Sequence, residues 1–265
     1  MGCVVELEGA VVIVTGSSSG VGAACARQLA ERGANVVVNY SDNREGAEAT
    51  KEAVEATGAE AIVVQANVAD DGDCRKLATA ADERWGRIDG LVNNAGTTRF
   101  NAHENLEGLS AQDFHDIYAV NTIGAYQMVR AVQPAMVRGG AGSVVNVASI
   151  AAVTGVGSSV AYAASKGALV TMTLSLARAL GPQLRVNAVC PGFIQGDWLR
   201  EGMGEERYNA VKSSLERNSP LGMTTTADTV SEAILLLLAG GDLITGETLI
   251  VDGGHHLMTA PLGRR

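Results

Sequence analysis

The sequence contains few cysteines, and none is placed as a disulfide framework or a metal site requires. The four cysteines among 265 residues are scattered, with no Cys-x-x-Cys pair and no histidine at ligand spacing: Cys3, Cys25, Cys74 and Cys190. The only paired histidines, His255 and His256, are adjacent, and neighbouring side chains of an extended segment point to opposite sides. We therefore expect no metal site, and thiols suited to a reducing compartment.

Long apolar runs and clustered positive charge are also missing. No stretch of 18 or more apolar residues occurs, and the first eight residues lack the basic start and apolar core of a secretory signal. The formal net charge is -9 and the pI is about 5.0, whereas binding to nucleic-acid phosphates needs clustered lysine and arginine. The sequence predicts a cytoplasmic protein that binds neither membranes nor nucleic acids.

Short runs rich in valine and isoleucine recur along the chain, and most lack an alternation of apolar and polar residues. Such runs are typical of strands that helices cover on both faces. Seven strands are expected: Ala10 to Val14, Asn35 to Val38, Ala61 to Val64, Gly90 to Val92, Ser143 to Val147, Arg185 to Val189 and Thr248 to Val251.

The longer segments between these runs have helical patterns. This alternation predicts an α/β fold, a Rossmann-type doubly wound parallel sheet of about seven strands with helices on both faces. No repeat, low-complexity tract or linker interrupts the pattern, so residues 1–265 are interpreted as a single domain. The expected helices are Val21 to Arg32, Arg44 to Thr57, Gly72 to Trp85, Ala111 to Arg138, Ala161 to Leu180 and Ala227 to Leu238.

Residues 193–223 form the least regular segment of the pattern. Irregular segments of this length inside compact domains are often lids or binding loops. We expect a substrate-side lid at about 193–223, with a plain surface excursion as the alternative.

Tyr162 and Lys166 stand four residues apart in an alanine- and leucine-rich segment without proline, a pattern that predicts a helix. Residues at this spacing share one helix face, so the lysine ammonium would lie beside the phenol. The ordinary pKa of tyrosine is about 10, and a nearby cation lowers it. A phenol tuned in this way can exchange a proton with an alcohol oxygen near neutral pH. Chance spacing on an ordinary helix is the alternative.

A glycine-rich turn follows the first predicted strand, in the sequence Thr15-Gly16-Ser17-Ser18-Ser19-Gly20-Val21-Gly22. Glycines let the backbone approach a pyrophosphate, and the start of the next helix favours its negative charge. The spacing Gly-x-x-x-Gly-x-Gly differs from the common dinucleotide pattern Gly-x-Gly-x-x-Gly. The segment predicts a nucleotide site, with a merely tight turn as the alternative.

The end of the second predicted strand bears on the choice of cofactor. In dinucleotide-binding folds, an acid about 20 residues beyond the glycines binds the ribose 2′-hydroxyl of NAD. Here Tyr40 occupies that strand end, Arg44 follows shortly, and Ser17 and Ser41 could donate hydrogen bonds, although Asp42 adds negative charge close by. The pattern favours NADP(H) over NAD(H), with Arg44 as a solvated first-turn residue as the alternative.

Further motifs occur in a fixed order along the chain. Asn93-Asn94-Ala95-Gly96 follows the fourth predicted strand, Asn121 lies in the next helix, and Ser149 precedes Tyr162 by thirteen residues. Pro191-Gly192 follows the sixth strand. Together with the glycine-rich turn and the Tyr162–Lys166 pair, this set resembles the short-chain dehydrogenase/reductase family, in its compact single-domain branch, from about residue 7 to 254.

The resemblance implies a role for each matching residue. Tyr162 would be the general acid/base, and Lys166 would lower its pKa and hold the nicotinamide ribose. Ser149 would bind the substrate oxygen, and Asn121 would support a proton relay through water to Lys166. The cofactor is expected against Gly16, Ser17, Ser18, Gly20, Val21, Gly22, Tyr40, Ser41, Arg44, Asn67, Val68, Asn94, Ala95, Gly96, Tyr162, Lys166, Pro191, Gly192 and Ile194.

Two positions depart from the family pattern. The chain has Asn67 where members usually have an aspartate that touches the adenine, and the asparagine carbonyl still offers an acceptor. It has Gln195 where many members carry a threonine that binds the carboxamide. These departures concern the ordering of the loop and the adenine contact rather than the chemistry.

The predicted function is an NAD(P)-dependent oxidoreductase that moves a hydride between the nicotinamide and a ketone or secondary alcohol. The pattern is nearest to 3-oxoacyl-(acyl carrier protein) reductases, with sugar or steroid alcohol dehydrogenases of the same family as alternatives. A cofactor-binding protein without turnover is the rival from another class. A second rival keeps the fold but performs epimerisation or dehydration on nucleotide sugars, and it would carry a sizeable substrate domain, for which the chain has little room. Since the family commonly forms homotetramers through the helices at 111–138 and 161–180, a homotetramer is expected.

Overall fold

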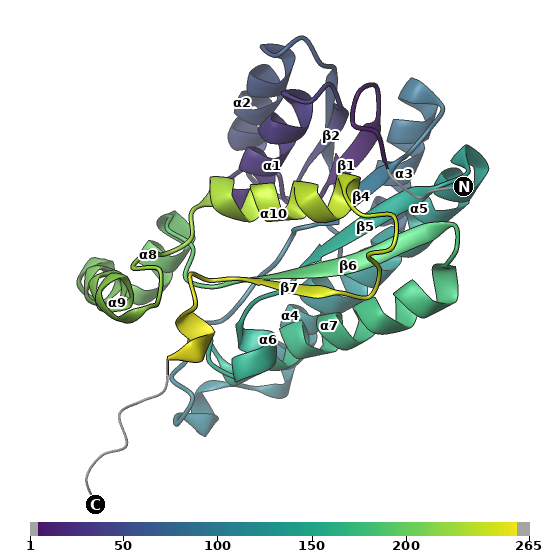
Figure 1. The fold of residues 1–265 in the computed structure, drawn as a ribbon. Helices are drawn as coiled ribbons and strands as arrows, with labels where there is room; N and C mark the ends of the chain where they lie inside the picture. The colour runs from purple at the N-terminus through teal and green to yellow at the C-terminus, as the bar shows by residue number, and fades with distance from the viewer. Residues whose placement is uncertain (1–4, 259–265) are drawn as a thin grey trace, which may run out of the picture.

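One seven-stranded parallel sheet organises the protein (Figure 1). The structure is a computed structural model that describes residues 5–258, so Cys3 lies outside the described residues. The strand order is β3-β2-β1-β4-β5-β6-β7, which confirms the predicted doubly wound α/β class. The strands are β1 (Val11–Val14), β2 (Asn35–Tyr40), β3 (Ala61–Gln65), β4 (Gly90–Asn93), β5 (Gly142–Val147), β6 (Leu184–Pro191) and β7 (Thr248–Val251).

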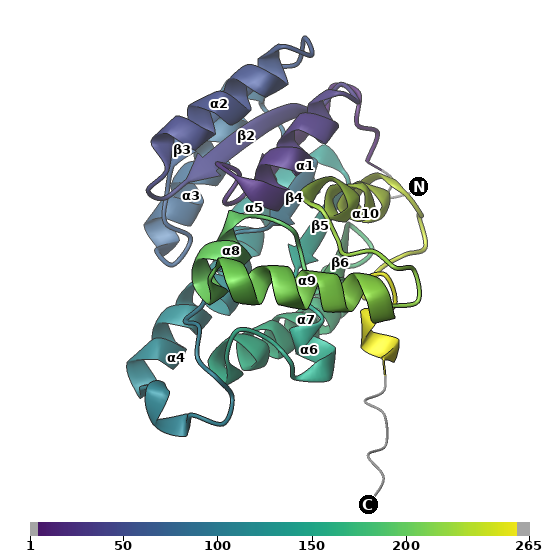
Figure 2. The same cartoon turned by 90° about the vertical axis from the view of Figure 1, so that its left-hand side faces the viewer.

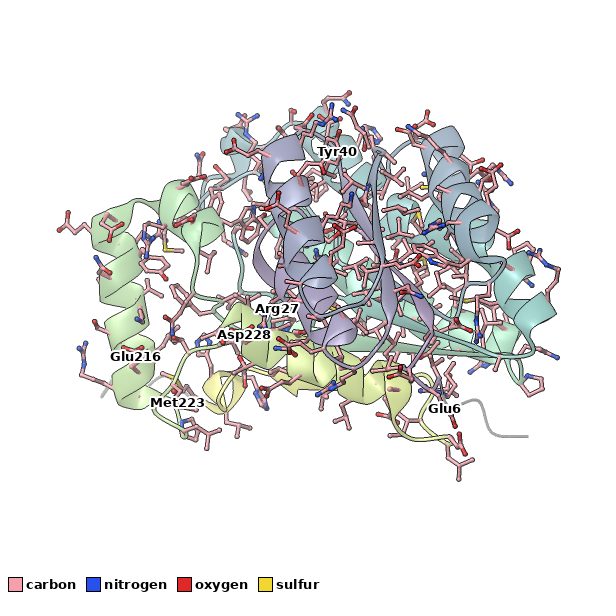
Figure 3. All side chains as sticks on the ribbon, turned by 90° about the horizontal axis from the view of Figure 1, so that it is seen from above. Glu6, Arg27, Tyr40, Glu216, Met223 and Asp228 are labelled. Carbon is pink, nitrogen blue, oxygen red and sulfur yellow. The ribbon has the colours of Figure 1, made fainter. Side chains whose placement is uncertain are left out.

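Helices cover both faces of this sheet (Figures 1 and 2). One layer comprises α1 (Gly20–Ala30), α2 (Arg44–Glu55) and α10 (Ala227–Ala239), and its core is built around Leu29 and Leu235. In this layer Arg27 and Asp228 point toward one another, with a nitrogen–oxygen distance of 2.6 Å (Figure 3). The opposite layer comprises α3 (Asp71–Trp85), α5 (Ala125–Gly139) and α7 (Val160–Leu180). The remaining helices are α4 (Ala111–Tyr118), α6 (Ala151–Thr154), α8 (Asp197–Met203) and α9 (Glu205–Asn218).

The predicted helix at 111–138 is wrong in one respect, because it is not continuous. A π-helical turn at Ala119–Gly124 separates α4 from α5. π-helical turns are rare and occur frequently at functional sites. The turn contains no proline, and its single glycine, Gly124, is its last residue, so the sequence pattern resembles one continuous helix.

The prediction of an irregular segment at 193–223 is also wrong, because the segment contains α8 and α9. Helix α9 begins with two glutamates, which suit the positive end of a helix dipole, and an ion pair links Lys212 to Glu216 one turn apart. Its fully buried residues are only Tyr208 and Leu215. So narrow a buried stripe leaves a weak helical pattern in the sequence.

Helix α7 is the one helix among residues 5–258 that is long and apolar enough to span a membrane by composition, with a mean hydropathy of 1.2. A core helix of a layered protein passes the same test. In this fold α7 packs against the sheet through buried residues that include Ala161, Leu169 and Ala177. Only 33% of its apolar window is buried, however, so much of its surface faces outward.

Candidate active site

A cavity of about 1730 Å³ lies along the carboxyl ends of the strands. Its walls come from the turn after β1, the ends of β2 and β3, the loops after β4, β5 and β6, and helices α8 and α9. Ligand pockets commonly measure about 300–1,000 Å³, so this cavity can hold a cofactor and a second ligand together. Open α/β sheets bind ligands at this edge because parallel strands and helix starts converge there.

The glycine-rich turn brings bare backbone to the cavity. Gly16 has a φ of +61°, and a side-chain carbon there would lie 2.9 Å from the Cα of Ala95. A side-chain carbon on Gly22 would lie 2.4 Å from the Gly16 carbonyl oxygen. The cavity is lined here by Ser18, Ser19 and Gly20, where α1 begins. A helix start that presents N–H groups without intervening side chains fits a dinucleotide pyrophosphate.

A compact set of hydrogen bonds joins this turn to the strands beside it. The Thr15 hydroxyl accepts from the backbone N–H groups of Asn94 and Ala95, at 3.0 Å each. The Asn94 side-chain amide donates to the carbonyls of Thr15 and Gly16, at 2.9 Å each. On the other side, the Asn39 side-chain oxygen accepts from the backbone N–H of Gly16 at 2.9 Å. The cofactor turn is therefore fixed by neighbours on both sides.

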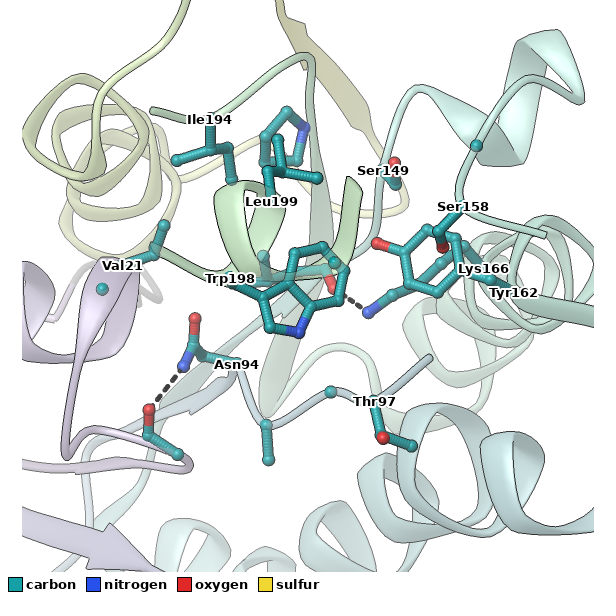
Figure 4. Close-up of a pocket in the computed structure, with 18 of the residues that line it drawn as sticks. Val21, Asn94, Thr97, Ser149, Ser158, Tyr162, Lys166, Ile194, Trp198 and Leu199 are labelled. Atoms are coloured by element: carbon teal, nitrogen blue, oxygen red, sulfur yellow. Dashed lines mark hydrogen bonds between the residues drawn. The ribbon is translucent and has the colours of Figure 1, made fainter. Parts of the chain in front are cut away.

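Ser149, Tyr162 and Lys166 line one end of the cavity together (Figure 4). Ser149 follows β5, and its hydroxyl oxygen accepts from the backbone N–H of Ala151 at 3.1 Å. Tyr162 stands in the first turn of α7, which Ser159 caps by accepting from the Tyr162 N–H. Lys166 follows one turn later, with its Nζ 5.8 Å from the centre of the Tyr162 ring.

The expected depression of the Tyr162 pKa by Lys166 is wrong for this structure. Part of the ring faces the cavity, but desolvation raises the pKa of Tyr162 to about 12, opposed by a hydrogen bond with the Ser149 hydroxyl. Burial also lowers the pKa of Lys166 to about 8, and its Nζ donates to the Val147 carbonyl at 2.7 Å. The ammonium is directed at the β5 carbonyl, and desolvation is the largest influence on the pKa of the phenol.

Asn121 lies on the π-helical turn and, unlike the other predicted catalytic residues, is not part of the cavity wall. It is buried, and its side-chain oxygen accepts from the Thr97 N–H at 2.8 Å. Its side-chain nitrogen donates to the Thr97 carbonyl at 2.9 Å and to the Ser165 hydroxyl at 3.0 Å. A side-chain carbon built on Gly96 would lie 3.5 Å from Asn121 Oδ1 and 3.6 Å from Lys166 Nζ. These two atoms therefore border the same small space.

Comparison with known proteins agrees with this geometry. A family model described as enoyl-(acyl carrier protein) reductase matches residues 16–256. The chain is 40% identical to a putative ketoacyl reductase of the granaticin polyketide synthase from Streptomyces violaceoruber, over 95% of this chain and 98% of that protein. It is 33% identical to a 3-oxoacyl-(acyl carrier protein) reductase from Staphylococcus aureus, over 92% and 97% of the two chains.

The solved structures give the same answer. A putative short-chain dehydrogenase/reductase from Burkholderia xenovorans superposes with a TM-score of 0.87 at 37% identity, covering 94% of this chain and 99% of its own. The chain belongs to the short-chain dehydrogenase/reductase family. Membership makes it an oxidoreductase by family and agrees with the nicotinamide cofactor predicted for the cavity.

Most of the cofactor residues predicted from the short-chain dehydrogenase/reductase pattern line the cavity. Asn67 and Gln195, the two departures, are among the lining residues. The Asn67 side-chain oxygen accepts from the Ala69 N–H at 3.1 Å, and the Gln195 amide donates to the Thr224 hydroxyl at 3.0 Å. The other predicted residues that line it are Gly16, Ser18, Gly20, Val21, Ser41, Val68, Asn94, Ala95, Gly96, Pro191, Gly192 and Ile194.

Four predicted cofactor residues are not placed on the cavity wall. Ser17 is fully buried, and its hydroxyl donates to the Val14 carbonyl at 2.7 Å, so it cannot donate to a 2′-phosphate. Gly22 supports the turn from behind, and Tyr40 is buried. Arg44 points outward with 75% of its side chain exposed, 3.6 Å from Glu48, and lines a separate surface depression on α2. As the first residue of α2, it projects away from the strand ends.

Sequence reasoning missed several lining residues of this short-chain dehydrogenase/reductase. Asn39 and Lys76 border the cofactor end, and Phe100 and Trp198 border the catalytic end. Lys76 lies on α3, and its Nζ donates a hydrogen bond to the Gln65 carbonyl at the end of β3. No sequence motif marks Lys76, which lies in the second turn of the helix that follows β3. Among residues 5–258, no group of three or more histidine, cysteine or acidic side chains is placed to hold a metal.

We predict that Lys166→Met stabilises the protein. The lowered pKa, from 10.5 to about 8, makes the buried ammonium unfavourable. That shift corresponds to about 3 kcal/mol, less about 1 kcal/mol for the lost hydrogen bond to Val147. Since the unfolded chain holds this proton more tightly, the penalty is fully present below pH 8 and fades as the pH rises toward 10.5. Denaturant unfolding should show the variant about 2 kcal/mol more stable at pH 7, with the gap about 1 kcal/mol smaller at pH 9.

Lys51→Met, on the exposed side of α2, is the matched control and should show no such dependence on pH. A Lys166→Met variant less stable than the parent at pH 7, or a gap independent of pH, would contradict the assigned burial cost.

Proposed function

We propose that the protein is an NADP(H)-dependent oxidoreductase that interconverts a ketone and a secondary alcohol. The observation that carries the proposal is the meeting of three side chains, Ser149, Tyr162 and Lys166, in the same cavity as the glycine-rich turn. A hydroxyl and a phenol that line the same end of the cavity can both address a single substrate oxygen.

When bound, the nicotinamide supplies the hydride in reduction and accepts it in oxidation. In reduction, Ser149 donates a hydrogen bond to the carbonyl oxygen and orients it. Tyr162 then transfers its proton to that oxygen as negative charge develops there. A pKa of about 12 keeps the phenol protonated at neutral pH, which suits the acid role. Lys166, whose pKa lies near 8, is close enough to neutrality to pass a proton onward.

Asn121 would serve the relay that restores this proton. Its side-chain nitrogen already donates two hydrogen bonds, but its side-chain oxygen keeps a second lone pair after accepting from Thr97. That oxygen and the Lys166 nitrogen border the same space beside Gly96. A water there would connect Lys166 to the cavity, as proposed for the relay.

The substrate class is best argued from the site and the relatives together. The relatives named above support a 3-oxoacyl thioester or a related ketone. The family model is described for an enoyl reductase, which acts on a carbon–carbon double bond. The Ser149–Tyr162 pair instead addresses an oxygen, which favours carbonyl chemistry. Sugar or steroid alcohols remain the alternative substrates, and α8 and α9 are proposed as the substrate-side lid.

The preference for NADP(H) rests on the charges at the end of β2. Asn39 and Tyr40 offer no carboxylate to a ribose 2′-hydroxyl, and the Asn39 amide is occupied by the carbonyls of Val64 and Ala66. Lys76 brings a cation to this end of the cavity. Asp42 opposes the preference, although its carboxylate already accepts from the Ser41 hydroxyl at 2.9 Å.

We also propose a homotetramer in the cytoplasm. Exposed apolar side chains on α5 and α7, including Tyr126 and Leu174, and the edge strand β7 support the assembly. The buried free thiols Cys25, Cys74 and Cys190 suit a reducing compartment, which cell fractionation would test.

We predict that Tyr162→Phe retains NADPH affinity within about threefold and loses about a thousandfold in turnover, since a general acid typically contributes 10²–10⁴-fold. Fluorescence titration with NADPH and nicotinamide absorbance with a ketone panel would measure the two quantities. Tyr126→Phe, at an exposed phenol on α5, is the matched control. Undiminished turnover in Tyr162→Phe would reject the acid role.

For the cofactor, we predict that Lys76→Ala weakens NADPH binding about tenfold and NADH binding less than twofold, because the lysine would pair with the 2′-phosphate. Arg44→Ala, with its outward side chain, should change neither affinity by more than about twofold. Equal losses for both cofactors in Lys76→Ala would remove this basis for selectivity.

Analytical ultracentrifugation at micromolar concentration should show a tetramer for the parent, and Leu174→Glu should dissociate it, because the charge would enter an apolar contact on α7. A monomeric parent protein would refute the proposed assembly.

A further inference from the structure

The aromatic side chains of this protein gather at the catalytic end of the cavity. The chain has only three phenylalanines and two tryptophans among its 265 residues. Two of the phenylalanines and one tryptophan line the cavity, together with the catalytic tyrosine: Phe100, Tyr162, Phe193 and Trp198. They come from three separate segments of the chain, around residues 100, 162 and 193–198, so local composition alone does not explain the grouping.

Three of these rings form one continuous wall. The Phe100 and Trp198 ring centres lie 5.7 Å apart with an interplanar angle of 58°. The Trp198 and Tyr162 ring centres lie 6.1 Å apart at 50°. Tilted pairs at these distances are favoured by the aromatic quadrupoles. The wall, defined here as Phe100, Trp198 and Tyr162, therefore ends at the phenol that carries the reacting proton.

The wall is held in place by its surroundings. A side-chain carbon on Gly202 of α8 would lie 1.9 Å from Phe100 Cε2, so the phenylalanine ring lies flush on the helix backbone. The loop that carries Phe100 is tied to the loop before α7, because the Asn101 N–H donates to the Ser158 carbonyl at 2.9 Å. The Thr98 and Ser158 hydroxyls are 2.6 Å apart.

Trp198 keeps an open surface toward the cavity. It is 49% exposed, and Figure 4 shows the indole projecting from α8 toward Tyr162 and Lys166. Because the two ring centres lie only 6.1 Å apart, a carbonyl compound bound at the Tyr162 hydroxyl can lie against the indole. A flat unsaturated ring covers such a surface with favourable stacking, whereas a flexible chain must lose rotational freedom to do so.

We propose that Trp198, supported by Phe100, is a specificity-determining residue. It selects ketones that carry a planar ring close to the carbonyl carbon. The inference rests on the proposed carbonyl reduction and narrows its substrate class. The overall step is unchanged: hydride adds to the carbonyl carbon, the Tyr162 proton adds to the oxygen, and the secondary alcohol leaves.

The test compares two ketones of equal carbon number, 2-tetralone with a fused aromatic ring and 2-decanone with a linear chain. With NADPH, the parent protein should favour 2-tetralone in kcat/KM by about tenfold, the size expected for one good aromatic contact. Trp198→Leu should lose about tenfold on 2-tetralone and less than twofold on 2-decanone. Trp198→Phe should retain most of the preference, and Gly202→Ala, which displaces Phe100, should weaken it.

Trp85→Phe is the matched control, since this second tryptophan lies on α3 and bonds to Glu60. It should leave both reactions unchanged. An equal loss on both ketones in Trp198→Leu, or no preference in the parent protein, would overturn the inference while leaving carbonyl reduction intact.

Binding can be followed without turnover in Trp85→Phe/Tyr162→Phe, where Trp198 is the single tryptophan. Saturable change of its fluorescence by 2-tetralone, but not by 2-decanone, supports the inference even if neither ketone is reduced. No response to 2-tetralone would overturn it. Absence of turnover with every ketone and either cofactor would instead reject the proposed function.

Discussion

The active end of this protein depends on one buried hydrogen bond, from the Lys166 ammonium to the carbonyl of Val147. It joins α7 to the end of β5 and so sets the distance between the phenol on the helix and the hydroxyl that follows the strand. The bond also holds an amine in surroundings that disfavour its charge, which lowers the pKa of Lys166 to about 8. Burial of the charged amine is unfavourable, and the hydrogen bond to Val147 offsets part of that cost while fixing the position of the lysine.

The cofactor end is built in a different way, from neutral hydrogen bonds. Thr15, Asn39 and Asn94 fix the glycine-rich turn through backbone and amide groups, without any ion pair. Such bonds are insensitive to pH and salt. They leave the helix dipole and the exposed backbone N–H groups free to bind the phosphates of the proposed dinucleotide. The glycine-rich turn is therefore fixed by neutral groups, whereas Tyr162 and Lys166, whose pKa values are shifted, lie at the other end of the cavity. The division suits a site in which one ligand stays oriented while a proton moves.

The sequence predicted the scaffold well and the edges of the site less well. All seven strands lie where valine-rich runs place them, because strands buried on both faces leave a strong pattern. Ser149, Tyr162 and Lys166 were predicted from the order of the motifs along the chain, and all three line one cavity. Arg44 was predicted to lie at the cofactor but has an exposed side chain away from the cavity wall. The direction of a side chain in the first turn depends on how α2 leaves the sheet, which no short motif encodes. Lys76 and Trp198 were missed for a related reason: long-range packing, rather than local pattern, brings them to the wall.

The π-helical turn at Ala119–Gly124 sets the rotational phase of everything that follows it in α5. A π-helical turn takes more residues than an α-helical turn, so it changes the angle at which the residues after it face the core. Ile117 is buried before the turn, and Met128, Val132 and Met136 are buried after it. Shortening the turn by one residue would rotate those three side chains out of the core. An insertion or deletion in residues 119–124 would therefore disrupt the packing of α5, even though these residues lie between two ordinary helices.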